Sequence, residues 1–149
     1  MPVKIIDKSL CCGCSACAQK CPKQCISMCE DKEGFLYPVI DEDVCVKCGL
    51  CEKVCVECHP YEKHMPLYAY ACKNPNESIR GISSSGGVFT LLAERILEQN
   101  GVVFGSRYDA NWKCVHDYIE EKKDIVKLRG SKYIPSKIGN NFNKALSFL

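Results

Sequence analysis

The chain has 149 residues, of which 46% are hydrophobic and 26% charged, and its formal net charge is +2. These values are ordinary for a globular protein and exclude a disordered or low-complexity chain, while the length allows one domain or two small ones. The outlier is cysteine, with 14 copies. Such a density is typical of a secreted disulfide scaffold or of a metal protein.

The N-terminal residues favour the metal protein. Met1 to Lys4 lead directly into the cysteines, without the apolar segment of a secretory signal. No apolar run reaches the length of a membrane span. We therefore expect a protein of the reducing cytoplasm, without a membrane span, whose thiols stay free to bind metal.

The small positive charge is no argument for a nucleic-acid partner. The formal +2 treats every cysteine as neutral, whereas metal ligation ionises the thiol. Eight thiolates around two iron–sulfur cores of about two positive charges each bring the total to about −2. We expect no nucleic acid among the partners.

Two runs of cysteines share one spacing at a constant offset of 34 residues. The first run is Cys11, Cys14, Cys17 and Cys21, followed by Pro22, and the second is Cys45, Cys48, Cys51 and Cys55, followed by Val56. Flanking residues repeat too, because Ile6-Asp7 matches Ile40-Asp41. The pattern indicates an internal duplication of one short unit.

The spacing suits a cubane [4Fe-4S] cluster. Two-residue gaps let a tight loop place three thiolates around it, and Gly13 and Gly49 allow close backbone approach. In two-cluster ferredoxins the fourth cysteine of each run ligates the other cluster. We therefore assign one cluster to Cys11, Cys14, Cys17 and Cys55, and the other to Cys45, Cys48, Cys51 and Cys21.

Six further cysteines fall outside this pattern: Cys12, Cys25, Cys29, Cys58, Cys72 and Cys114. Cys12 aligns with Val46 and is expected to face away from the cluster, and the others are interpreted as small buried hydrophobes. Zinc is the alternative metal, but its sites usually combine two widely separated pairs. Disulfides within such short loops would be strained.

Residues 1–60 are predicted to form a two-cluster ferredoxin-like domain within an α+β protein. A polar turn over residues 30–34 and a strand over 35–40 indicate a hairpin, with Val3 to Ile5 as the symmetric strand. So short a unit buries little apolar area, so its core would be largely the clusters. We expect the metal-free segment to be poorly ordered.

Residues 61–80 are interpreted as a linker and a first strand, and residues 81–149 as part of an incomplete α/β domain. The strand is expected at 67–72, with a turn at 73–77. A Ser/Gly-rich loop, residues 83–87, then opens a helix with an apolar stripe, capped by Ser84 or Ser85 and ended at Gly101. Strands are predicted at 102–105 and 112–119 around a turn at 107–111, and helices at 120–128 and from residue 143.

The Ser/Gly-rich loop is also a candidate anion site, because a helix start offers free N–H groups. A cap with a tight turn is the plainer interpretation, and the residues alone favour it. Lys127, Arg129 and Lys132 could similarly meet phosphates, although a solvated basic loop is the default interpretation.

Five stretches in one order carry a family resemblance: CCGCSACAQKCP, EDKEGFLYPVID, CVKCGLCEKVC, SSSGGVFTLLAERILEQNGVVFG and LRGSKYIPSKIG. They resemble the β-subunit family of deazaflavin-coenzyme-reducing hydrogenases and dehydrogenases. That family couples [4Fe-4S] clusters to a flavin, usually FAD. By position, the resemblance implies a flavin neighbourhood of Ser84, Ser85, Gly86, Gly87, Arg129, Ser131, Lys132 and Tyr133.

Family members are much longer, and this chain ends inside an expected helix, so we expect it to be part of a longer protein that binds FAD. The predicted function is electron transfer between clusters, a flavin and a redox partner protein or diffusible carrier. No catalytic acid, base or nucleophile stands out. A ferredoxin module that only relays electrons and a structural zinc module are the alternatives.

Overall fold

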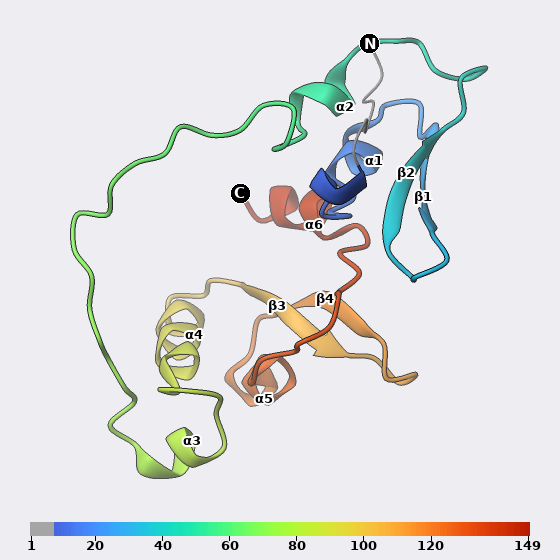
Figure 1. The fold of residues 1–149 in the computed structure, drawn as a ribbon. Helices are drawn as coiled ribbons and strands as arrows, with labels where there is room; N and C mark the ends of the chain where they lie inside the picture. The colour runs from blue at the N-terminus through green and yellow to red at the C-terminus, as the bar shows by residue number, and fades with distance from the viewer. Residues whose placement is uncertain (1–7) are drawn as a thin grey trace. The chain divides into compact units, whose positions relative to one another are not determined.

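The computed structural model describes residues 8–149 (Figure 1). The chain divides into two compact units. The first comprises the chain up to His64, with residues 142–147 and Leu149, and the second runs from Met65 to Asn141, with Phe148. The strand expected at Val3 to Ile5 lies outside the described residues.

The first unit combines short helices with one hairpin. Its elements are η1 (Lys8–Leu10), α1 (Ala16–Lys20), β1 (Ile26–Glu30), β2 (Leu36–Ile40) and α2 (Leu50–Lys53). β1 and β2 pair antiparallel, so the predicted hairpin is confirmed. Asp31 stabilises its turn, because Oδ1 accepts hydrogen bonds from the backbone N–H groups of Glu33 and Phe35.

The two cysteine loops share one backbone conformation. In the first loop Gly13 and Ser15 have positive φ, and in the second Lys47 and Gly49 do. These positions correspond under the offset of the cysteine runs, although glycine occupies the first site in one loop and the second site in the other. Two non-glycine residues thus hold a conformation that costs L-residues energy. The loop geometry is therefore maintained in both copies.

Sulfur dominates the core of the first unit. Its buried residues are Cys25, Ile26 and Cys51. Around them pack partly buried residues, namely Cys17, Ala18, Cys21, Ile40, Cys45 and Cys55. With so few aliphatic side chains, this unit gains little from hydrophobic burial.

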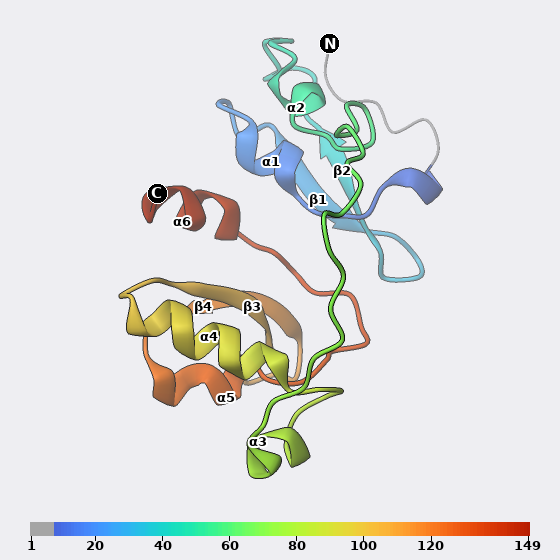
Figure 2. The ribbon, with the colours of Figure 1, turned by 90° about the vertical axis from the view of Figure 1, so that its left-hand side faces the viewer.

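The second unit packs helices against a second antiparallel hairpin (Figure 2). Its elements are α3 (Glu77–Gly81), α4 (Val88–Glu98), β3 (Val103–Tyr108), β4 (Cys114–Ile119), η2 (Lys122–Asp124) and α5 (Ile125–Leu128). Val103 lies opposite Ile119, and Tyr108 opposite Cys114. Lys137 adds a parallel bridge to Val115. The last helix of the chain is α6 (Asn141–Ser147).

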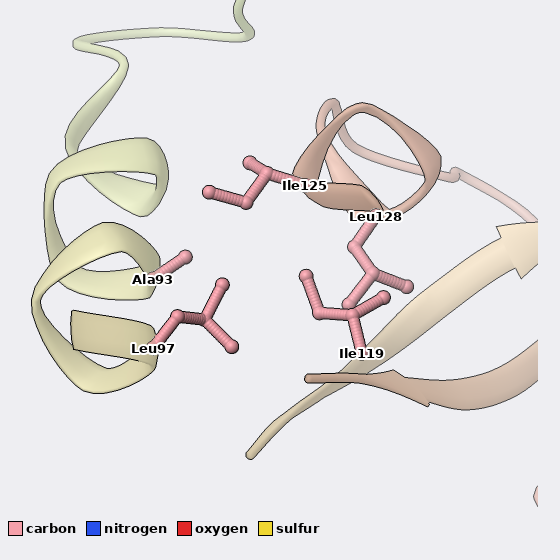
Figure 3. Close-up of a cluster of buried hydrophobic side chains, with 5 residues drawn as sticks. All are labelled: Ala93, Leu97, Ile119, Ile125 and Leu128. Atoms are coloured by element: carbon pink, nitrogen blue, oxygen red, sulfur yellow. The ribbon is translucent and has the colours of Figure 1, made fainter. Parts of the chain in front are cut away.

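An aliphatic cluster forms the core of the second unit (Figure 3). Ala93 and Leu97 on α4 point toward Ile125 and Leu128 from α5, and Ile119 at the end of β4 completes the cluster. Phe89 and Val103 pack against it. At about 1.5–3 kcal/mol for each buried large aliphatic side chain, this core can stabilise the unit without metal.

The strand predicted in residues 61–80 is wrong, whereas the turn predicted after it is present with a shifted end. Residues 67–72 form no strand, and Leu67 and Tyr70 are 90% and 81% exposed. An isolated strand leaves its backbone groups without partners, and no strand pairs with this segment in the described structure. The turn expected at 73–77 is present up to residue 76, where the N–H of Asn76 donates to Oδ1 of Asn74. It leads into α3, whose N-cap Asn76 accepts a hydrogen bond from the N–H of Ile79.

The helix after the Ser/Gly-rich loop is confirmed, but its cap differs from the prediction. Gly87, with φ 67°, is the N-cap of α4, and no side chain caps the helix. Ser84 and Ser85 are therefore not its caps. The buried face is Thr90, Ala93 and Leu97, whereas the apolar side chains of Leu92 and Ile96 are exposed.

The remaining predicted elements are present with shifted ends. The strands expected at 102–105 and 112–119 are β3 and β4, and Trp112 lies in the turn between them. The helix expected at 120–128 is divided into η2 and α5, and the last helix begins at Asn141. Within residues 8–149, no helix has both the length and the apolarity needed to cross a membrane.

Candidate metal centres and anion loop

The four cysteines of the first predicted set line one pocket of the first unit. Cys11, Cys14 and Cys17 come from the first loop and the start of α1, and Cys55 follows α2. Met28 and Pro38, which face each other across the hairpin, form an apolar wall. The pocket therefore combines soft sulfur donors with an apolar wall.

The four cysteines of the second set line another pocket. Cys45, Cys48 and Cys51 belong to the second loop and α2, and Cys21 is the C-cap of α1. Ile26 at the start of β1 and Pro22 are among its apolar walls. Each pocket thus receives three cysteines from one run and the last cysteine of the other.

This donor set fits an iron–sulfur cluster. Four thiols around one water-poor cavity supply the ligation that a cubane requires. Backbone N–H groups also reach the sulfurs, because Ala16 donates to Cys14 and Ala18 to Cys17. In the described part of the chain, no three His, Cys, Asp or Glu side chains meet in the geometry that a single metal ion requires.

Burial controls the protonation of these thiols. It raises the pKa of Cys17 to about 11, and it raises that of Cys14, helped by Cys12 and Cys11 nearby. Burial also acts to raise the pKa of Cys21, but hydrogen bonds from Cys25 and neighbouring backbone N–H groups outweigh it and lower that pKa. Because ligands must be deprotonated, cluster binding has to release these protons.

Cys25 is a residue whose polar contact the sequence did not reveal. It is 8% exposed, as expected for a small buried hydrophobe, but it lines the second pocket. Its Sγ lies 3.4 Å from Sγ of Cys21. This hydrogen bond, followed by burial, raises the pKa of Cys25 to about 11.

Two exposed thiols lie beside the first pocket. Cys12 lines it and hydrogen bonds to Cys14, so the prediction that Cys12 faces away does not describe this structure. Cys58 hydrogen bonds to Cys55; burial and this bond raise its pKa. Two properties therefore distinguish the adjacent Cys11 and Cys12. Only Cys11 fits the spacing of the second cysteine run, and Cys11 is half-buried whereas Cys12 is exposed.

In the second unit, the fold brings together two predicted motifs that are far apart in sequence. The hydroxyl of Ser84 accepts a hydrogen bond of 2.9 Å from the N–H of Ser131. Gly87 and Arg129 line the same pocket, whose volume is about 500 Å³ including its open mouth. Hydroxyls, a guanidinium and helix-start N–H groups are donors suited to an anion.

Other residues of that predicted set are placed differently. The Lys132 ammonium donates to the carbonyl oxygens of Leu128, Arg129 and Gly130 at 2.9–3.0 Å, so it serves the loop rather than the pocket. Tyr133 is 92% exposed. Gly86 has a structural role, because a Cβ there would lie 2.8 Å from the carbonyl oxygen of Cys72. Ser85 does not line the pocket.

Two buried polar residues support the pocket and were not predicted. Asn74, 2% exposed, donates from Nδ2 to the carbonyl oxygen of Gly87, and its backbone N–H donates to Gly86. Thr90, 1% exposed, accepts a hydrogen bond from Nε of Arg129. The only sequence signal was that Thr90 interrupts the apolar side of a helix.

Residues 69–141 match the model of a protein family. This family is described as coenzyme F420 hydrogenase/dehydrogenase, beta subunit, N-terminal part. The chain is 30% identical over 139 residues to a coenzyme F420-dependent sulfite reductase of Methanocaldococcus jannaschii, an alignment that covers 87% of this chain and 20% of the relative. It is 35% identical over 65 residues to an iron-sulfur subunit of the CoB--CoM heterodisulfide reductase of the same organism, covering 35% of this chain and 10% of that protein. The chain thus spans a fifth or less of these relatives.

Proposed function

Through residues 69–141 the chain belongs to the family of the coenzyme F420 hydrogenase/dehydrogenase beta subunits, and from this premise we propose that it is an electron-transfer protein with two [4Fe-4S] clusters. The observation that carries the proposal is the pair of cysteine-lined pockets. Each contains three cysteines of one run and the fourth of the other, which is the ligand pattern of two-cluster ferredoxins.

The residues of the chain have defined tasks in this function. When bound, the clusters supply one-electron redox chemistry. The cysteines hold them, and the N–H groups of Ala16 and Ala18 stabilise negative charge on the sulfurs. The apolar walls, such as Met28 and Pro38, keep water from the first pocket.

We further propose that the Ser84–Arg129 pocket belongs to a flavin site, with FAD as the cofactor. Ser84, Gly87, Arg129 and Ser131 line the pocket and are the residues assigned to the anionic part of the cofactor. Lys132, Ser85 and Gly86 would then hold the loop rather than the ligand. A flavin there would connect one-electron transfer in the clusters with two-electron chemistry.

The names of the relatives support a redox role. One relative is named as dependent on coenzyme F420 and the other as an iron–sulfur protein. We propose that this protein exchanges electrons with a redox partner protein or a diffusible carrier of the deazaflavin type. A second candidate is a relay module without catalysis of its own, because all eight assigned ligands lie in the first unit.

Anaerobic purification or reconstitution, followed by iron and acid-labile sulfide analysis, tests the cluster proposal. We expect about eight irons per chain and visible absorption that dithionite bleaches. Cys11→Ala should lose about half of the iron, and Cys12→Ala should keep all of it. Zinc in place of iron would contradict the proposal, and the opposite result for the two variants would reverse the assignment of the doublet.

Fluorescence titration with FAD tests the flavin proposal. We expect the chain to quench the flavin, with Ser84→Ala and Arg129→Gln weakening binding and Arg95→Gln, an exposed arginine on α4, leaving it unchanged. Equal binding by Arg129→Gln and the unsubstituted chain would remove this pocket from the flavin site.

A further inference from the structure

Cys25 is a buried thiol that no ligand pattern requires. It lies outside the spacing of both runs, yet its Sγ lies 3.4 Å from Sγ of Cys21, within the range of a sulfur hydrogen bond. It is 8% exposed and lines the same pocket as Cys21, Cys45 and Cys48. A residue in this place faces the cluster ligands directly.

The ligand role of Cys21 determines the direction of the hydrogen bond. A cysteine that ligates iron is a thiolate and has no proton to donate. Cys25 must therefore be the donor if the contact is kept.

We propose that Cys25 donates an S–H hydrogen bond to the ligating sulfur of Cys21 and so raises the reduction potential of that cluster above the potential of the other. The proposal rests on the two-cluster function proposed above. Hydrogen bonds to the sulfurs set cluster potential, because they stabilise the more negative, reduced state. Cys25 is thus a tuning residue that acts through Cys21.

Among the described residues that line the first pocket, no thiol outside the assigned ligands is buried, and the buried hydroxyl of Ser15 donates to the carbonyl oxygen of Gly13 rather than to a sulfur. The position of Cys25 corresponds in the internal repeat to His59, which is exposed. Cys58, which reaches Cys55, and Cys12, which reaches Cys14, are exposed thiols. Water competes with an exposed donor, so these two contacts are expected to shift the potential less than Cys25 does. The clusters would then differ in potential, which gives electron transfer between them a direction.

The test is a redox titration followed by EPR spectroscopy on the reconstituted full chain and its variants. In Cys25→Ala we expect the full iron content, a downward shift in one of the two potentials and no change in the other. Cys25→Ser keeps a donor and should return that potential toward the unsubstituted value. Cys29→Ala, at an exposed cysteine of β1 that lines neither pocket, should shift neither potential.

Three outcomes overturn the inference in different ways. Loss of half of the iron in both Cys25→Ala and Cys25→Ser would make Cys25 a ligand rather than a donor to one. Full iron content with both potentials unchanged in Cys25→Ala would remove the hydrogen bond from cluster tuning. A shift in reduction potential in Cys25→Ala that is no larger than the shift in Cys58→Ala would remove the proposed difference between the pockets. Absence of iron from the unsubstituted chain would instead overturn the proposed function itself.

Discussion

The two units of this protein have cores of opposite chemistry. The core of the first is centred on Cys25, Cys51 and a few aliphatic groups, and that of the second on Ala93, Leu97, Ile119, Ile125 and Leu128. The first core thus consists largely of thiols with few aliphatic groups, whereas the second consists of aliphatic side chains that pack against one another. From this difference we expect the first unit to depend on its clusters and the second to fold by hydrophobic burial.

Iron removal should have the largest effect and would sharpen this contrast most. After chelation, we expect amide hydrogen exchange to speed up throughout the β1–β2 hairpin, because binding free energy is folding free energy in a unit with so small a core. Exchange in β3 and β4 should stay slow. Equal protection of both hairpins in the metal-free chain would show that the first unit folds without its clusters.

Ile125→Ala should damage the second unit selectively. Ile125 is 3% exposed in the aliphatic core, and removal of such a side chain costs about 2–5 kcal/mol of unfolding free energy. Urea unfolding followed by circular dichroism measures the loss. The matched control is Val126→Ala, 66% exposed, for which we expect a change within about 0.5 kcal/mol. Iron content that falls with Ile125→Ala would contradict the independence of the two cores.

Asn74→Ala tests the support of the Ser/Gly-rich loop within the second unit. The substitution leaves the carbonyl of Gly87 and the N–H of Asn76 without their side-chain partner. We expect a cost of about 1–3 kcal/mol of unfolding free energy, measured by urea unfolding, and faster amide exchange in residues 83–87. Asn111→Ala, in the exposed β3–β4 turn, should be near neutral. An unchanged free energy of unfolding in Asn74→Ala would show that the loop does not depend on the Asn74 side chain.

The smallest effect concerns the pH dependence of one surface ion pair. The Lys122 ammonium lies 2.8 Å from Oε1 of Glu98, and this hydrogen bond, followed by Coulomb attraction, lowers the pKa of Glu98. The contribution to stability is fully present above the ordinary pKa of 4.5 and is lost as the pH falls through the lower folded value. An NMR titration of the Glu98 carboxyl should show the lowered pKa. In Lys122→Met, the pKa of Glu98 should rise toward its ordinary value. Identical pKa values of Glu98 in the two proteins would show that the ion pair does not affect this carboxyl.

The sequence predicted local features well where a short stretch of the chain carries the whole pattern. The hairpin at residues 26–40 followed from a polar turn between apolar runs, and the helix beginning near residue 88 from its periodicity. The prediction of a strand at 67–72 failed because a strand needs a pairing partner. The apolar residues of this segment, such as Leu67 and Tyr70, do not reveal from the sequence whether a partner exists. Ser84 failed as a helix cap because Gly87 is the N-cap of α4. The Ser84 hydroxyl instead accepts a hydrogen bond from Ser131, a residue 47 positions away.

The sequence by itself determined the candidate ligands and their division into two sets, because spacing and duplication are properties of the chain that no packing alters. Only the tertiary structure decided the neighbours of those residues. It places Cys25 against Cys21, joins Ser84 to Ser131 and engages Lys132 with carbonyl groups. Such contacts depend on how loops fold back on one another, and the residue types at these positions are compatible with many other partners.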